Sequence, residues 1–292
     1  MKNIIYATIL CSFLISGLKA QDFLDSLMTA SEPKYVSASF KGTRLIGLPT
    51  IETQGKGTVE FRVSHRFGDF NSGGYNFWGL DGGASIWLGL DYALTDRFTI
   101  GVGRNSIQKL YDSNFKYKLL QQRTDNQMPI SLTLYLGVNY TGMRDPEKLA
   151  TGRDMYAYAV NRFSYIHSVL IARKFNERFS LQVQPMHIHY NIVELNSDKN
   201  TIFAIGGLAR YKVSKRAAIT AEYTSTINDY KGDLRQFADV LSLGFELETG
   251  GHVFQTYVSN ASALNPAQFV PYTTTFWDNG GSRLGFSISR VF

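Results

Sequence analysis

The sequence predicts an all-β fold, an antiparallel up-and-down transmembrane β-barrel, with twelve strands as the preferred count and ten or fourteen as alternatives. Three observations favour this fold. Apolar and polar residues alternate through many segments of about ten residues, long and short connections alternate along the chain, and aromatic residues are abundant. The 20 Phe, 17 Tyr and 3 Trp, with 26 Gly and only 7 Pro, favour strands joined by turns.

The alternation is clearest in two segments. Across 130–139 the even positions are apolar and the odd positions are mostly polar or small, and 58–67 shows a similar pattern in the opposite phase. Successive side chains of a strand point to opposite faces, so each segment has one apolar and one polar face. A tilted strand of about this length crosses a bilayer. The predicted strands are 57–67, 84–92, 98–103, 109–122, 130–139, 163–175, 179–192, 204–212, 217–224, 241–248, 252–259 and 283–292.

The connections between these strands vary in length in a regular order. The short ones are 95–97, 176–178, 213–216 and 249–251. The long ones are 68–83, 141–161, 226–236 and 260–281, whereas 107–109 and 123–128 depart from the scheme. Outer-membrane barrels have short periplasmic turns and long extracellular loops, whereas a soluble sandwich has no reason to sort its loops in this way. The order therefore places the end of the last strand on the periplasmic side.

The first twenty residues are expected to be a secretory signal peptide, because Lys2 precedes an apolar run over 4–18 and Ala20 ends a plausible cleavage site. Cys11, the only cysteine, lies in this run, so the mature chain is expected to lack disulfides and thiolate metal sites. The formal net charge of the full chain is +6, and removal of the signal peptide takes away two lysines. The small positive charge that is left does not indicate a nucleic-acid partner.

Two further segments need an interpretation. Residues 21–56 are expected to form a lead segment, either periplasmic or lying in the lumen, ahead of a barrel of residues 57–292. Within 179–192 the apolar face changes parity, from Val183 to Met186, with Pro185 at the change. Because proline cannot donate to a strand ladder and one extra residue exchanges the faces, the sequence predicts a β-bulge at Pro185.

Several short segments carry a family resemblance. They are 61–68, 89–98, 171–175, 178–181, 250–254 and the ending 287–292. Together they resemble an uncharacterised family of bacterial outer-membrane β-barrel proteins, a domain of unknown function, over nearly all of 35–292. The resemblance implies a barrel in the cell outer membrane. It implies no substrate, reaction or site residue.

The polar strand faces are expected to line the barrel interior. The lumen-lining candidates are Glu60, Arg62, Arg66, Trp87, Arg104, Glu222, Glu246 and Glu248. Charges on the inner wall of a barrel either line an aqueous path or pair across it. A twelve-stranded barrel is narrower than a porin, so side chains of this length are able to close it by ion pairing.

The residues indicate no catalytic residue, cofactor or metal site. His187 and His189 share one strand face and offer two imidazoles to a metal ion, but no acidic or thiol partner is near in sequence. A lipid-acting enzyme needs a serine beside an oriented histidine, whereas His167 and Ser168 are neighbours that point to opposite faces. We therefore expect the protein not to be an enzyme.

Two functions of different class remain open, and a lipid-acting membrane enzyme is a less favoured third. A small channel or passive transporter of unknown substrate is slightly favoured by the charged inner face. The alternative is a non-conducting structural or adaptor barrel that binds a partner through loops 141–161 and 260–281 or through residues 21–50. A lead segment threaded through the lumen would favour the alternative. Outer-membrane lipid is the expected environment, and the barrel-insertion machinery is the expected partner of residues 283–292.

Deletion of Phe292 is expected to lower the yield of folded protein in the outer membrane, because the last strand closes the barrel and resembles the signal that insertion machinery recognises. The measurement is the heat-modifiable band of membrane fractions on gels. An unchanged folded yield would contradict this role of Phe292.

Overall fold

The structure is a computed structural model that describes residues 34–145, 154–193, 195, 197–228 and 237–292. Within this part of the chain, twelve antiparallel strands form one closed barrel, in which each strand pairs with its sequence neighbours and β1 pairs with β12. The predicted fold and strand count are confirmed. The predicted signal peptide lies outside the described residues.

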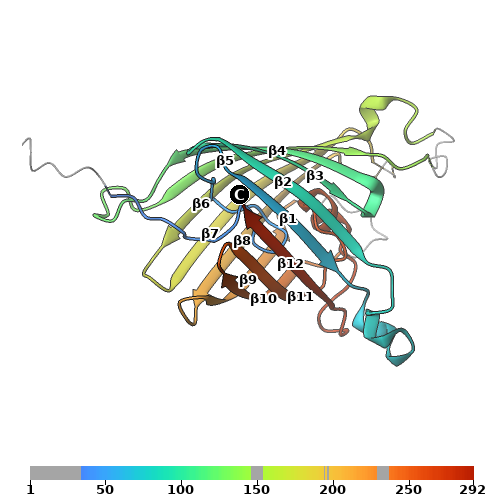
Figure 1. Cartoon of the computed structure of the whole chain (residues 1–292). Helices are drawn as coiled ribbons and strands as arrows, with labels where there is room; N and C mark the ends of the chain where they lie inside the picture. The colour runs from blue at the N-terminus through green and yellow to red at the C-terminus, as the bar shows by residue number, and fades with distance from the viewer. Residues whose placement is uncertain (1–33, 146–153, 194, 196, 229–236) are drawn as a thin grey trace, which may run out of the picture.

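The strands are β1 (Val59–Arg66), β2 (Ser85–Thr95), β3 (Phe98–Asn105), β4 (Leu110–Leu120), β5 (Ser131–Thr141), β6 (Phe163–Lys174), β7 (Phe179–Tyr190), β8 (Thr201–Lys212), β9 (Ala217–Thr226), β10 (Val240–Thr249), β11 (His252–Ser259) and β12 (Arg283–Val291). The short helices are η1 (Phe70–Ser72), η2 (Gly74–Gly79), η3 (Ile107–Lys109), η4 (Ala159–Arg162) and α2 (Pro266–Tyr272). Figure 1 shows most of the short turns at the left end of the barrel and η1 and η2 at the right end.

The two faces of the barrel wall differ as the alternation predicts. Along β2, Leu88 and Leu90 lie on the outer face, whereas Trp87 and Asp91 are buried inside. Large apolar side chains cover the outer face of the other strands as well, as is typical of a barrel that faces lipid. No helix in the described ranges is long and apolar enough to cross a membrane.

The barrel interior contains part of the lead segment. Residues 38–52, which we call the plug segment, form a tight hairpin that is closed by a bridge between Arg44 and Pro49. The chain enters and leaves at the end that carries the short turns, where Val36 N–H donates to Gln122 O at 2.8 Å and Lys56 N–H donates to Asp96 at 2.9 Å. Most plug residues are buried, so the structure places this part of the lead segment in the lumen.

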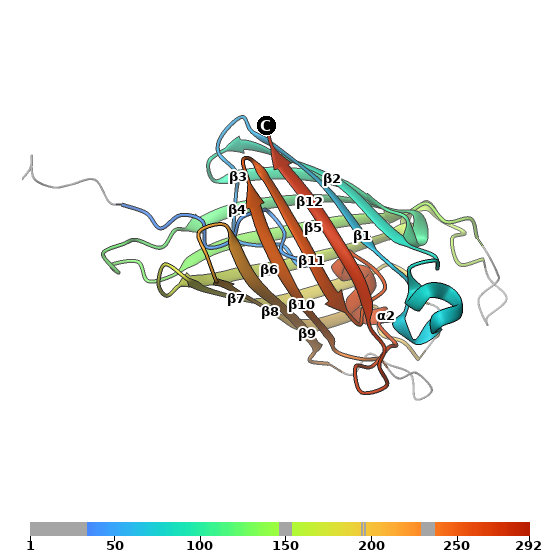
Figure 2. The same cartoon turned by 60° about the horizontal axis from the view of Figure 1, so that its bottom comes forward.

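A second segment fills the lumen from the opposite end. Residues 260–275, which we call the inner loop, fold inward and carry α2 (Figure 2). The loop is mostly buried, and its Phe269 is 1 % exposed. A Cβ added to Gly47 of the plug segment would lie 2.8 Å from the Phe269 ring, so the two segments meet inside the barrel.

The inner faces of β6, β7 and β8 are partly apolar where they meet these two segments. The side chains that form this apolar surface are Ile166, Leu170, Met186, Ile188, Ile202, Ala204 and Leu208. Leu48 of the plug segment belongs to the same core and lies against Gly206, where the absence of a side chain leaves room for it.

The predicted β-bulge at Pro185 is wrong. Ser168 pairs with Met186 and Ile171 pairs with Val183, so the β6–β7 register on either side of Pro185 is the same and no residue is inserted. The apolar face changes parity because Met186 points into the protein-filled lumen, where an apolar side chain is buried as in any core. His187 and His189, which alternate with Met186 and Ile188 along β7, lie on the outer face instead.

Substitution of Ile188 by Ala is expected to lower the free energy of unfolding by about 2–5 kcal/mol, because it removes buried methyl groups from this internal core. Ile188 is 0 % exposed, whereas Val183 of the same strand is 39 % exposed on the outer face. Val183→Ala is therefore the matched control, with a smaller expected loss. The measurement is the urea midpoint of the folded barrel, and equal losses in the two variants would contradict the face assignment.

Candidate functional site in the barrel lumen

Seven of the eight predicted lumen-lining residues do point into the barrel. They are Glu60, Arg62, Arg66, Trp87, Glu222, Glu246 and Glu248. The prediction for Arg104 is wrong, since its guanidinium lies over the ring of Tyr111 at 5.2 Å on the outer face. Arg104 has the same parity as the outward-facing Val102, and a long side chain near a strand end reaches the polar headgroup region.

Glu222 on β9 holds the tip of the plug hairpin. Its buried carboxylate accepts hydrogen bonds from three consecutive backbone N–H groups, those of Ile46 at 3.2 Å, Gly47 at 3.0 Å and Leu48 at 3.0 Å. Successive N–H groups that converge in this way form an anion-binding nest. The barrel wall therefore supplies an anion that the plug backbone is shaped to bind.

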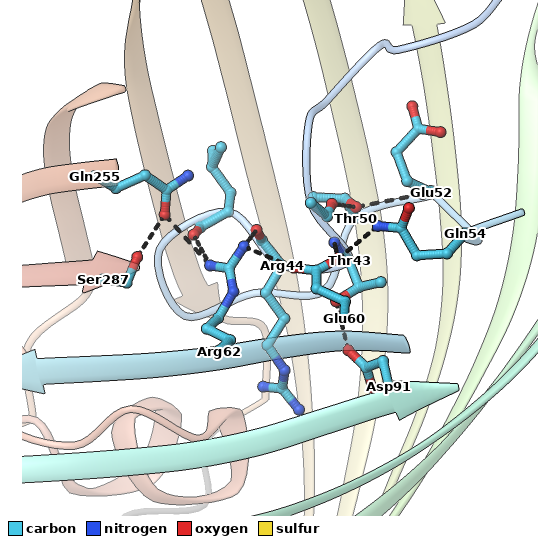
Figure 3. Close-up of polar contacts among 12 residues, drawn as sticks. Thr43, Arg44, Thr50, Glu52, Gln54, Glu60, Arg62, Asp91, Gln255 and Ser287 are labelled. Carbon is cyan, nitrogen blue, oxygen red and sulfur yellow. Dashed lines mark hydrogen bonds and ion pairs between the residues drawn. The ribbon is translucent and has the colours of Figure 1, made fainter. Parts of the chain in front are cut away.

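Two cations on the opposite part of the wall hold the plug carbonyl groups. Arg62 on β1 donates to Arg44 O at 2.7 Å and to Leu45 O at 2.9 Å (Figure 3). Lys116 on β4 donates to Thr50 O at 3.0 Å, and also to the carbonyl of Thr43. Hydrogen bonds with an ionised partner are stronger than neutral ones, so these two cations are major contacts of the plug.

Carboxylates on β1 and β2 hold the first strand of the plug hairpin. Thr43 N–H donates to Glu60 at 3.0 Å, and the Thr43 hydroxyl donates to Asp91 (Figure 3).

Gln182 on β7 holds the second strand of the hairpin. Its side chain accepts from Ile51 N–H at 2.8 Å and donates to Pro49 O at 2.8 Å. The plug segment is thus bound around its perimeter by side chains from many strands.

The side chain of Arg44 extends from the plug segment to the inner face of β2 and β4. Its guanidinium carbon lies 4.6 Å from the centre of the Trp87 ring, and Nη2 lies 3.4 Å from an Asp112 oxygen. The Trp87 indole N–H donates to the other Asp112 oxygen at 2.8 Å, which fixes the carboxylate beside the ring. Two glycines make room for the indole: a Cβ at Gly89 would overlap the ring, and one at Gly103 would lie 2.7 Å from it.

The inner loop has its own set of wall contacts. Arg66 donates to Ala261 O at 3.1 Å and to Ala263 O, and its guanidinium lies over the Tyr257 ring at 5.2 Å. Asn265 donates to Asn139 at 3.1 Å.

Near the short-turn end, Arg210 binds both Glu246 at 2.7 Å and Glu248 at 3.1 Å. Lys41 of the plug segment reaches Glu248 at 2.8 Å. Two of the predicted lumen-lining residues, Glu246 and Glu248, therefore belong to one ion-pair network with Arg210 and Lys41, as charges in a narrow lumen are expected to do.

Sequence reasoning missed several residues that bind the plug segment. They are Asp91, Asp112, Lys116, Gln182 and, from the plug itself, Arg44. The first four lie on the polar faces of predicted strands, and on β4 the alternation of Asp112, Asn114, Lys116 and Lys118 with aromatic and aliphatic residues was available as a signal. Arg44 had no such signal, because a lead segment has no wall position until the barrel is assembled.

His187 and His189 lie on the outer face, and the nearest imidazole nitrogen to His187 belongs to His167, with 3.0 Å between the two Nδ1 atoms. Among the described residues, no group of three or more His, Cys, Asp or Glu residues is arranged to hold a metal ion.

Substitution of Glu222 by Ala is expected to accelerate hydrogen exchange of the amides at 46–48 by about tenfold or more. Each hydrogen bond to a charged group contributes about 1.5–3 kcal/mol, and about 1.4 kcal/mol corresponds to tenfold in an equilibrium. The measurement is hydrogen–deuterium exchange of the folded barrel, read by mass spectrometry on peptides that cover the plug segment.

Thr224→Ala is the matched control, since Thr224 lies two residues along the same face of β9 and its buried hydroxyl has no hydrogen-bond partner among the described residues. This control is expected to leave the exchange unchanged. If the amides at 46–48 exchange equally fast in the Glu222→Ala variant and in the unmodified protein, Glu222 does not hold the plug segment.

The fold is similar to the NanC porin, with 9% identity, 80% of this chain and 98% of that chain covered, and a TM-score of 0.49. It is also similar to the KdgM porin, with 9% identity, coverage of 80% and 99%, and a TM-score of 0.47. An outer-membrane channel from Pseudomonas putida has 14% identity, coverage of 83% and 98%, and a TM-score of 0.47. Comparison with curated proteins finds no match.

A family model described as "Membrane bound beta barrel domain", a domain of unknown function, matches residues 40–292. The match includes most of the plug segment together with all twelve strands of the described barrel. The apolar outer face is in contact with membrane lipid, and closed barrels of this kind lie in the outer membrane. The chain belongs to this family of membrane-bound β-barrel proteins and is an outer-membrane protein.

Proposed function

We propose that this protein is an outer-membrane channel or passive transporter that its own plug segment closes at rest and that opens when the plug segment is displaced. The proposal rests on the kind of contact that holds the plug segment in the lumen. Many of its contacts to the polar part of the wall are hydrogen bonds to the plug backbone, in which Glu222 accepts from N–H groups and Lys116 donates to carbonyl oxygens. The plug adds no strand to the barrel.

Such contacts are reversible at moderate cost. The plug hairpin keeps its own backbone bonds, Thr50 N–H to Thr43 O at 2.9 Å and Leu45 N–H to Leu48 O at 3.0 Å, wherever it lies. Its bonds to the wall exchange for bonds to water when it leaves, and the net contribution of such a bond is only about 0.5–1.5 kcal/mol, or about 1.5–3 kcal/mol with a charged partner. The charged inner face is then suited to line an aqueous path.

The inner loop is the second barrier in this proposal. It closes the lumen from the extracellular end, and Phe269 meets Gly47 at the tip of the plug hairpin. Displacement of the plug segment therefore removes one side of the packing that holds the inner loop. Opening from the periplasmic end loosens the extracellular barrier through this contact.

A second candidate is a non-conducting adaptor barrel, and one observation favours it. The lead segment enters the lumen as a hairpin and binds the periplasmic turn between β4 and β5, where Thr124 N–H donates to Lys34 O at 2.9 Å. In this alternative the plug segment is a permanent part of the core. The adaptor would bind a periplasmic or extracellular partner and conduct no ions.

The last strand and Phe292 are proposed to contact the barrel-insertion machinery during assembly. The barrel is proposed to perform no reaction, so the solute passes through it unchanged.

The test is conductance of the full-length protein in planar bilayers. Glu222→Ala combined with Gln182→Ala removes the acceptors of four plug N–H groups. The open fraction is expected to rise about tenfold or more over the unmodified protein, since at least one charge-assisted bond of about 1.5–3 kcal/mol is lost from the closed state only.

The matched control is Thr220→Ala combined with Thr224→Ala, which changes two buried, unpartnered hydroxyls on either side of Glu222. It is expected to conduct like the unmodified protein. Heat-modifiability on gels confirms that each variant is folded. Persistent silence of the folded Glu222→Ala/Gln182→Ala barrel would reject the channel and leave the adaptor.

A further inference from the structure

We propose that the wall site now filled by Arg44 is a binding site for a cationic solute that carries a guanidinium or alkylammonium group, with Arg44 as its tethered stand-in. This inference rests on the proposed function, because the site becomes free only when the plug segment moves. It deepens that function by naming the class of solute.

The site has the two parts that a guanidinium requires. The Trp87 ring presents its face at 4.6 Å from the guanidinium carbon, and the Asp112 carboxylate lies at its edge at 3.4 Å. Trp87 and Asp112 are only 3% and 4% exposed. An aromatic face attracts a cation most strongly where water is excluded, and a carboxylate adds a charge-assisted hydrogen bond.

The wall holds these two groups in place without the help of Arg44. The indole N–H donates to Asp112 at 2.8 Å, so the ring and the carboxylate orient each other. The glycines at 89 and 103 let the indole lie flat against the wall, because a side chain at either position would collide with it. The site is therefore preorganised on β2, β3 and β4, which are rigid parts of the barrel.

Departure of the plug segment changes the charge balance of the lumen toward the negative. Among the described wall residues, five carboxylates lose a plug partner, and they are Glu60, Asp91, Asp112, Glu222 and Glu248. Two cations, Arg62 and Lys116, lose plug carbonyls. Glu248 loses Lys41 but keeps Arg210. Since carboxylates outnumber cations among these groups, the vacated lumen favours cations over anions.

An anionic solute fits the same space less well. Arg62 stays within 3.4 Å of Glu60 and 3.3 Å of Gln255 after the plug leaves, so an anion would meet a cation that is already paired. Among the described residues, Asp112 has Arg44 as its ion-pair partner, and after Arg44 leaves it keeps hydrogen bonds to neutral groups such as the Trp87 indole N–H. The charge left beside the Trp87 ring is therefore negative, and the cation that loses its plug carbonyls, Lys116, lies four residues further along β4.

The experiment uses the full-length protein with Arg44→Ala, which empties the site while every wall residue stays in place. Trp78→Phe and Trp277→Phe leave Trp87 as the only tryptophan, so the fluorescence of the folded barrel reports on the site. The probe is methylguanidinium chloride, and the control probe is methylurea, which is similar in shape and neutral.

Methylguanidinium is expected to change the Trp87 fluorescence in a saturable way, whereas methylurea has no such effect. Addition of Asp112→Asn is expected to weaken binding about tenfold or more. The matched control is Asp239→Asn, which removes a carboxylate that is exposed and bonded to the Tyr223 hydroxyl, and it is expected to leave the binding unchanged. With Arg44 present, half-saturation is expected at a concentration about tenfold or more higher, because the tethered guanidinium competes for the site.

Three results would overturn the inference: equal responses to methylurea and methylguanidinium, no effect of Asp112→Asn, or equal binding with and without Arg44. If the Asp112→Asn barrel is not heat-modifiable and so has not folded, Asp112→Glu replaces it. This variant keeps the negative charge but shifts its position, and weaker binding is again expected. The fluorescence readout needs no conductance. A silent barrel that binds methylguanidinium therefore contradicts the proposed gating alone, and a conducting barrel that ignores it contradicts this inference alone.

Discussion

The carboxylate of Glu222 and the three backbone N–H groups that converge on it are the contact on which the lumen architecture depends. A backbone segment inside a barrel carries polar groups that require partners, because an unpaired buried N–H or C=O group is costly. The plug segment keeps a few of these bonds within its hairpin and obtains the rest from wall side chains. The buried charges of the wall thus serve as partners for the backbone of another part of the chain.

The inner surface of the barrel wall has two parts that differ in polarity. On β1, β2 and β4 the inner face carries charged groups that bind the plug backbone and Arg44. On β6, β7 and β8 the inner face is partly apolar and packs against Leu48 and Phe269. The apolar side packs against the plug segment and the inner loop as a protein core does, and in the proposed channel the polar side supplies contacts that water or a solute is able to replace. A barrel with both kinds of wall is suited to a closed state that opens.

Much of the fold follows from local pattern. The alternation within 58–67 and 130–139 and the order of loop lengths were sufficient to predict twelve strands and most of the lumen-lining residues. Arg104 was misplaced although its parity with Val102 indicated the outer face, where its side chain lies over the Tyr111 ring. The bulge at Pro185 was predicted because the apolar residues of one strand were expected to share one face, and Met186 points into a protein core instead.

The sequence by itself determined the strands, their faces and the closure of the barrel, because a period of two and the length of a strand are local properties. Only the tertiary structure decided what occupies the lumen. The position of Arg44 between Trp87 and Asp112 joins residues far apart in the chain, and so does the contact between Gly47 and Phe269. Such contacts depend on the closed barrel bringing distant strands around one interior, and no local pattern in the lead segment encodes which wall groups it will meet.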